Sequence, residues 1–256
     1  MLNGIDYKQF LLNFSKTLIY QQIQKDFDII TCQKGIQPSL DFKKRTGLTF
    51  REIYGKRSYT VEGKTSISIT TLYYLQFLLD KSPDYIHDIG CGWNIWKRYY
   101  PNIVGIDFEG DYADVKDKFN DRFVENNREK FSSAMSVNTF LGLKESKNSD
   151  PLPCIPTTFE NYIEHLTYFA QIISPGGRAF VSINKLGFLQ YTSDKWFKDN
   201  NVSKYDSDKL SKLLLQDLQN NFPYKILCFD CELDPLDSIS FDGCVRLVFE
   251  KVDRFT

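Results

Sequence analysis

From residue 66 onward, apolar positions along the chain follow two alternating periods. Short, mainly apolar segments, such as 85–89, 103–107 and 179–183, are typical of strands in the interior of a sheet. Between these runs, apolar residues recur three or four positions apart, as on one face of an amphipathic helix. Alternating strands and helices predict an α/β fold, in which a mostly parallel sheet carries helices on both faces.

The elements follow from the same periodicity. The expected strands are 85–89, 103–107, 111–115, 132–138, 179–183, 224–232 and 243–252. The expected helices are 66–81, a short one at 95–100, 116–130, one that starts at Thr157 or Thr158 and is stopped by Ser174-Pro175-Gly176-Gly177, and 206–221. The last two strands are separated only by a turn-rich segment, which predicts an antiparallel pair.

The first 65 residues have a different pattern. Helical spacing of apolar residues marks 1–30, whereas 31–65 are punctuated by glycines and have poor periodicity. We therefore expect an N-terminal cap or lid over 1–65 and a core domain over 66–256. Within the cap, 43–57 hold six basic residues against one acid, interleaved with aromatic residues. Nucleic acid is a possible partner of this segment, and a solvated face is the alternative.

Composition limits the function classes. The chain of 256 residues has 32 basic and 33 acidic residues and a net charge of −1, so no general attraction to nucleic acid or anionic membrane follows. The apolar runs are too short to span a membrane. Six scattered cysteines without a signal peptide predict a reducing, cytoplasmic location. Cys228 and Cys231 lack further ligands for a zinc set, so no metal is expected.

The segment with the most chemical information is Tyr85-Ile86-His87-Asp88-Ile89-Gly90-Cys91-Gly92-Trp93-Asn94. A second apolar run ends fifteen residues after Gly92, in Asp107. A strand, a glycine turn and a second strand that ends in a carboxylate together hold an adenosine by its ribose. Ile95 stands where a pyrophosphate-binding fingerprint would need glycine, and Asp88 would repel pyrophosphate but attract a cation. A nucleotide-dependent oxidoreductase is therefore the weaker alternative.

The residues D-I-G-C-G-x-N followed by G-I-D resemble the cofactor site of class I S-adenosylmethionine (SAM)-dependent methyltransferases. The resemblance covers roughly 66–252 and includes Pro-Gly-Gly before a strand and the terminal strand pair. It implies a Rossmann-like sheet, SAM as cofactor and Asp107 on the ribose. Asp114 is expected near the adenine amino group, with Asp111 and Asp117 as alternatives. The implied cofactor-binding residues are Asp88, Gly90, Cys91, Gly92, Asp107 and Asp114.

Two asparagines occupy positions of interest in this resemblance. Asn138 ends the fourth-strand candidate, where some amino-methylating members carry an Asx-Pro-Pro-aromatic motif whose amide orients the target nitrogen. Asn138 matches the Asx, although both prolines are absent, and is the expected catalytic residue. Asn94 replaces the third glycine of the motif, and we expect its amide to cap the following helix or to touch the cofactor carboxylate, with capping favoured.

These features predict an enzyme that moves a methyl group from SAM to an unidentified acceptor. A small molecule is favoured as acceptor because the charge of the chain is balanced. Two alternatives stay open. One is a methyltransferase-like pseudoenzyme that acts as a binding or scaffold subunit, which the atypical Asn94 and the missing prolines leave possible. The other is a nucleic-acid methyltransferase.

Overall fold

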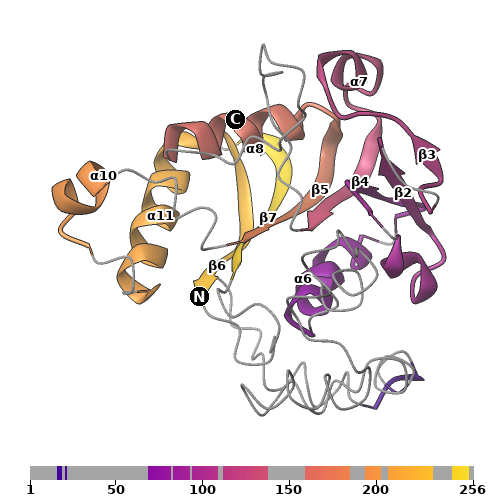
Figure 1. Cartoon of the computed structure of the whole chain (residues 1–256), viewed down its shortest axis with the longest axis horizontal. Helices are drawn as coiled ribbons and strands as arrows, with labels where there is room; N and C mark the ends of the chain where they lie inside the picture. The colour runs from indigo at the N-terminus through magenta and orange to yellow at the C-terminus, as the bar shows by residue number, and fades with distance from the viewer. Residues whose placement is uncertain are drawn as a thin grey trace, which may run out of the picture.

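The computed structural model describes residues 16–18, 21, 69–81, 83–92, 94–108, 112–137, 159–184, 194–202, 207–232 and 244–253. Its centre is a seven-stranded sheet in the order β3-β2-β1-β4-β5-β7-β6 (Figure 1). The strands are β1 (Ile86–Ile89), β2 (Ile103–Asp107), β3 (Val115–Lys116), β4 (Phe131–Val137), β5 (Ile173–Asn184), β6 (Tyr224–Glu232) and β7 (Cys244–Asp253).

The pairing of the strands confirms the predicted fold class. Strands β1 to β5 pair in parallel, and β7 runs antiparallel to both β5 and β6. The helices are α6 (Ile69–Leu79), the 3₁₀ helix η2 (Ile95–Arg98), α7 (Asp121–Asn126), α8 (Phe159–Ala170), α10 (Asp194–Asp199) and α11 (Ser207–Asn221). The sheet is therefore Rossmann-like, mostly parallel, with a C-terminal antiparallel pair.

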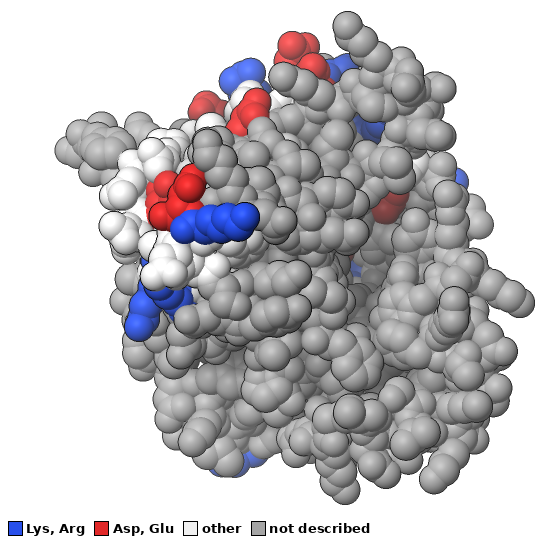
Figure 2. All heavy atoms as spheres, turned by 60° about the vertical axis from the view of Figure 1, so that its left-hand side comes forward, with Lys and Arg blue, Asp and Glu red and all other residues white. Residues whose placement is uncertain are grey.

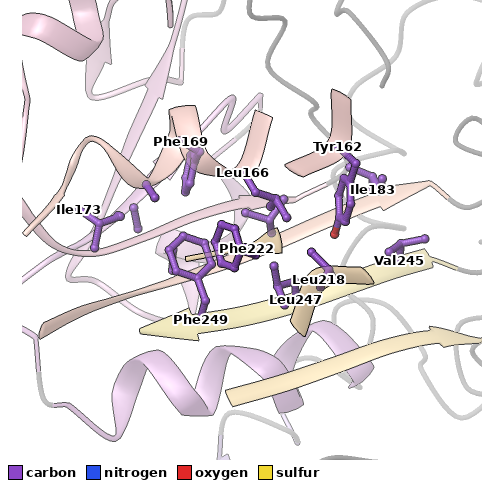
Figure 3. Close-up of a cluster of buried hydrophobic side chains, with 14 of the residues drawn as sticks. Tyr162, Leu166, Phe169, Ile173, Ile183, Leu218, Phe222, Val245, Leu247 and Phe249 are labelled. Atoms are coloured by element: carbon purple, nitrogen blue, oxygen red, sulfur yellow. The ribbon is translucent and has the colours of Figure 1, made fainter. Parts of the chain in front are cut away.

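Helices cover both faces of this sheet. On one face, α8 and α11 pack on the strands through a large apolar cluster (Figure 3), which includes Tyr162, Leu166, Phe169, Leu218, Phe222, Leu247 and Phe249. On the other face, α6 buries Leu75 and Leu78 completely beside Phe180 and Val248. Each fully buried side chain of this size contributes about 1.5–3 kcal/mol, so the two clusters hold the helices to the sheet.

The third strand and the helix after it differ from the prediction. The strand expected at 111–115 is only Val115–Lys116, because Asp114 turns back toward β2 and its N–H donates to the carbonyl of Gly105 at 2.8 Å. The helix expected at 116–130 is limited to Asp121–Asn126. Asn120 caps it by accepting a hydrogen bond from Phe123 N at 3.0 Å, so the helix begins one turn later than its polar pattern indicated.

The run Ser174-Pro175-Gly176-Gly177 does not merely end a helix, as the sequence indicated. It lies inside β5, and α8 ends before it at Ala170. Along β4, Phe131 pairs with Ile173 but Ser133 pairs with Arg178, so the extra residues of β5 form a bulge. Gly176 has a φ of 73°, and a Cβ on Gly177 would lie 2.9 Å from Ser132 O. Both glycines are therefore required by the bulge.

A cluster of three charged side chains links the end of α6 to the sheet. Arg178 Nη1 donates to the carbonyl of Phe77 at 2.7 Å, and Arg178 Nε lies 2.9 Å from Glu250 Oε2. Lys81 Nζ approaches the same oxygen at 3.4 Å. This cluster satisfies a carbonyl in the last turn of α6 and sets where the chain enters β1.

Most of 1–65, including the basic stretch 43–57, lies outside the described residues, so the cap and its contact with nucleic acid stay predictions. No helix within the described part of the chain has the length and apolarity needed to cross a membrane.

Candidate functional site

The topology brings three predicted segments to one edge of the sheet. From β1 the chain adds β2 and β3 on one side, whereas β4 and β5 lie on the other. At such a switch point, the carboxyl ends of the parallel strands border a crevice. The glycine turn follows β1, Asp107 ends β2, and β4 ends at Val137, directly before Asn138. Asn138 itself lies outside the described residues.

The glycine turn is tied to β2 by its backbone. Gly90 and Gly92 have φ values of 75° and 53°, in the left-handed region that costs other residues roughly 1–2 kcal/mol. Gly90 N and Cys91 N both donate to the carbonyl of Ile106, at 2.8 and 3.3 Å. The turn therefore presents backbone without side chains at the crevice, which is what a closely held ligand requires.

Asp107 meets this turn directly. The N–H of Gly92 donates to Asp107 Oδ2 at 2.8 Å, so the motif and the acid at the end of the second strand form one site. This bond sets the orientation of the Asp107 carboxylate relative to the turn. The contact of Asp107 with a ribose stays a prediction.

One aromatic residue directly after Asp107 was not singled out from the sequence. Phe108 follows Asp107 and is 48% exposed. A large exposed ring at the carboxyl end of β2 offers a flat apolar surface of the kind that a nucleobase contacts. The signal available in the sequence was an aromatic residue directly after the acid that ends the strand.

Asp88 has an unusual environment for a carboxyl group. It stands opposite Gly105 of β2 and Met135 of β4, and only 2% of it is exposed. Burial, with a smaller contribution from the negative charge of Asp107, raises the pKa of Asp88 to about 8. Asp88 is therefore protonated at neutral pH, and a cation that enters the site favours its ionised form.

Cys91 is a packing residue in this turn. Only 9% of it is exposed. Burial, and then the charges of Asp88, Asp107 and Asp114, raise the pKa of the Cys91 thiol. The group stays a neutral thiol, which excludes it as a nucleophile at physiological pH.

The predicted capping role of Asn94 is wrong. Asn94 precedes η2 with φ 49° and ψ 39°, and its side chain makes no capping hydrogen bond. Instead its Nδ2 donates to Asp114 Oδ2 at 2.8 Å and to the carbonyl of Tyr112 at 3.0 Å. A capping asparagine has extended backbone and accepts a helix N–H through its side-chain oxygen, whereas Asn94 has left-handed backbone and directs its amide toward Asp114.

Asp114 is held by three donors of the chain itself. Its Oδ2 accepts from Asn94 Nδ2 and from Gly105 N, each at 2.8 Å, and its Oδ1 contacts Lys97 Nζ. Burial opposes ionisation, but the hydrogen bonds from Lys97, Gly105 and Asn94 and the charge of Lys97 lower the pKa of Asp114. The group is an anion at neutral pH. Its predicted contact with adenine stays a prediction.

The charges of the described surface are mixed. Figure 2 shows described acidic and basic side chains lying beside each other on one face.

Among the residues that the structure describes, no group of three or more His, Cys, Asp or Glu could hold a metal ion.

No protein-family model matches the chain, and no curated protein sequence does. Solved structures resemble its fold. The 1,6-didemethyltoxoflavin-N1-methyltransferase of Burkholderia thailandensis, solved with S-adenosylhomocysteine, is 12% identical, with 79% of this chain and 84% of that chain covered and a TM-score of 0.42. The CurJ carbon methyltransferase is 9% identical, with 91% of this chain and 70% of that chain covered and a TM-score of 0.43.

A third solved structure, a SAM-dependent methyltransferase from Archaeoglobus fulgidus, is 13% identical, with 70% of this chain and 90% of that chain covered and a TM-score of 0.38. Identities and TM-scores this low carry no conclusion about activity. The residues of the site have to support the function on their own.

Proposed function

We propose that the chain is a class I SAM-dependent methyltransferase. The observation that carries the proposal is the 2.8 Å hydrogen bond from Gly92 N to Asp107 Oδ2 at the switch point of the sheet. It joins a side-chain-free turn, which tolerates close approach of a ligand, to a carboxylate suited to a ribose. The buried Asp88 at the entrance to that turn adds a partner for a positive charge.

The residues present fit an adenosyl sulfonium amino acid. Asp107 would accept from the ribose hydroxyls, and the exposed ring of Phe108 would lie against adenine. The backbone of Gly90 and Gly92 would border the amino-acid part, with Asp88 near its positive charge. An uncharged adenosyl ligand would gain nothing from Asp88, so this carboxyl supports a cationic cofactor.

When bound, SAM supplies a methyl group on a sulfonium that is already a good leaving group. The contribution of the chain is to hold acceptor, methyl carbon and sulfur in line, which is catalysis by proximity and orientation. We propose that Asn138, directly after β4, accepts a hydrogen bond from an amino acceptor and orients its lone pair toward the methyl group. The proposed acceptor is a small molecule, which the net charge of −1 supports.

Calorimetric titration with SAM and with S-adenosylhomocysteine tests the proposal. We expect micromolar dissociation constants, roughly −8 kcal/mol. Asp107→Ala should weaken binding by about 1.5–3 kcal/mol, because hydrogen bonds from ribose to a charged group are lost. Asp199→Ala, which removes an exposed carboxylate on α10, is the matched control and should bind as the wild type does. A wild-type protein that binds neither compound would disprove the proposal.

The acceptor is found by transfer of a labelled methyl group from SAM to fractionated small molecules, proteins and nucleic acids. Label in a small-molecule fraction supports the proposed acceptor class, and label in nucleic acid rejects it. Binding of SAM with no transfer to any fraction would instead support a scaffold subunit.

A further inference from the structure

We propose that Asn94 is a positioning residue that holds the glycine turn against the β2–β3 segment, with Asp114 as its anchor rather than a ligand of adenine. The proposal rests on the proposed function, because the turn is positioned for SAM. It concerns a departure of this chain from the glycine expected at position 94.

The orientation of the Asn94 amide follows from its partners. Both groups in contact with Nδ2, the Asp114 carboxylate and the Tyr112 carbonyl, can only accept hydrogen bonds. The nitrogen must therefore point at them, and a flipped amide would place oxygen against oxygen. Asn94 is 7% exposed, whereas Asp114 lies at the surface, so these bonds are shielded from water on the Asn94 side only.

The backbone of Asn94 is as specific as its side chain. Its left-handed φ of 49° is one that glycine adopts freely and asparagine tolerates better than most residues. Its N–H donates to the carbonyl of Cys91 at 2.8 Å, and this hydrogen bond closes a turn between Cys91 and Asn94. Glycine would permit the same turn, but it would lack the amide that reaches Asp114.

The chain provides a space for this amide at Gly105. A Cβ on Gly105 would lie 2.5 Å from both Cγ and Nδ2 of Asn94. No side chain larger than hydrogen fits there while the amide is in place. The N–H of Gly105 also donates to Asp114 Oδ2, so Asn94, Gly105 and Asp114 form one unit.

This unit stands beside the proposed ribose contact. Gly105 precedes Asp107 by two residues on β2, and Gly92 precedes Asn94 by two in the turn. The Gly92–Asp107 bond and the Asn94–Asp114 bond thus join the same two segments at two points. Two ties fix the turn relative to the carboxylate before a ligand arrives, which lowers the entropy lost on binding.

A pair of substitutions separates positioning from simple packing. Asn94→Gly keeps the left-handed backbone but removes the amide, and should lower affinity for S-adenosylhomocysteine about tenfold. Gly105→Ala alone should lower both the melting temperature and the affinity, because its methyl group meets Asn94. In the double variant the methyl occupies the vacated space, so the melting temperature should recover while the affinity stays about tenfold low.

The anchor role of Asp114 is tested with S-inosylhomocysteine, which has no amino group on its base. If Asp114 anchors Asn94, Asp114→Asn should lower the affinity for both ligands by the same factor. If Asp114 binds the adenine amino group, only the affinity for S-adenosylhomocysteine should fall, and that result overturns the inference.

Two further outcomes would also overturn the inference. One is Asn94→Gly with wild-type affinity, and the other is a double variant whose affinity recovers with its melting temperature. Both leave the proposed function intact as long as the wild-type protein binds and Asp107→Ala binds more weakly, as predicted above. A wild-type protein that binds neither SAM nor S-adenosylhomocysteine rejects the function and the inference together.

Discussion

Three aspartates of the candidate site differ in their environments, because each has different neighbours. Asp88 is buried and protonated at neutral pH. Asp107 is oriented by the N–H of Gly92. Asp114 is kept ionised by Lys97, Gly105 and Asn94. A carboxyl group alone therefore does not indicate a role, and each residue has to be argued from its contacts.

The state of Asp88 predicts a pH dependence of cofactor binding. A cation in the site favours ionised Asp88, so below a pH of about 8 binding must release the proton that this residue holds. The affinity for SAM should therefore fall as the pH is lowered from 8 to 6, by up to about tenfold per pH unit. Calorimetry in buffers of different ionisation enthalpy measures the proton released.

Asp88→Asn is the control, because it replaces a protonated carboxyl with a neutral amide of the same shape. Its affinity should be low and nearly independent of pH over this range. The pH dependence of fold stability has the opposite direction to that of SAM affinity. The raised pKa stabilises the fold below the unfolded pKa of about 4, and this contribution declines as the pH rises and is lost above about 8. A wild-type affinity that does not change between pH 6 and 8 would contradict the cation role.

Asn138 gives a prediction on the acceptor side of the site. If its amide orients an amino acceptor, Asn138→Ala should lower kcat by roughly 10²-fold while SAM affinity changes little, since only a contact in the transition state is lost. Single-turnover transfer and calorimetry measure the two quantities. Loss of SAM affinity of equal size would show that Asn138 is a cofactor ligand.

At the scale of elements, the junction between α6 and the sheet depends on one buried acid. Glu250 is 9% exposed and accepts from Arg178, which also holds the carbonyl of Phe77. Burial opposes its ionisation, but the hydrogen bond from Arg178 and the charge of Lys81 lower the pKa of Glu250. Arg178 and Glu250 therefore fix α6 at the end of the sheet where β1 begins. The glycine turn lies at the other end of β1.

Glu250→Gln should therefore lower the free energy of unfolding by about 1–3 kcal/mol at pH 7, because charge-assisted bonds are lost in a buried setting. Because the folded pKa is lowered, the contribution of Glu250 is present above its unfolded pKa and is lost as the pH falls through the folded pKa. Urea unfolding at pH 7 and at pH 3 measures this, and the difference between wild type and variant should shrink at pH 3.

The exposed Glu125→Gln on α7 is the matched control and should change the unfolding free energy by less than about 0.5 kcal/mol. Equal effects of the two substitutions would mean that the α6 junction depends on apolar packing alone.

For the whole molecule, the open question is the relation of 1–65 to the sheet. We predict that this segment covers the crevice at the carboxyl ends of β1 and β4. Hydrogen exchange of its amides should then slow when S-adenosylhomocysteine is added, because bound ligand favours the closed arrangement. Peptides from α11, which packs on the face opposite α6, serve as the internal control. Unchanged exchange in 1–65 would contradict the cap.

The amino-acid sequence by itself determined the order of the elements and indicated which of their ends carry the candidate site residues. Strand and helix periods are local properties, so β1, β2, α11, β6 and β7 lie where the pattern predicted them. The glycine turn was also predictable, since left-handed backbone at Gly90 and Gly92 is encoded by the residues themselves. The pairing of this turn with Asp107 followed from the parallel topology.

Only the tertiary structure decided the features that depend on distant neighbours. The state of Asp88 is set by its burial between β2 and β4, which no local pattern reveals. The Asn94 amide donates to Asp114, twenty positions away, and does not cap the adjacent helix, because its backbone is left-handed and the carboxylate lies within reach of Nδ2. The Ser174–Gly177 run reads locally as a stop, yet it lies in β5 as a bulge, because Ile173 before it and Arg178 after it both pair with β4. Local sequence sets what a segment favours, and contacts between segments decide which option has the lowest free energy.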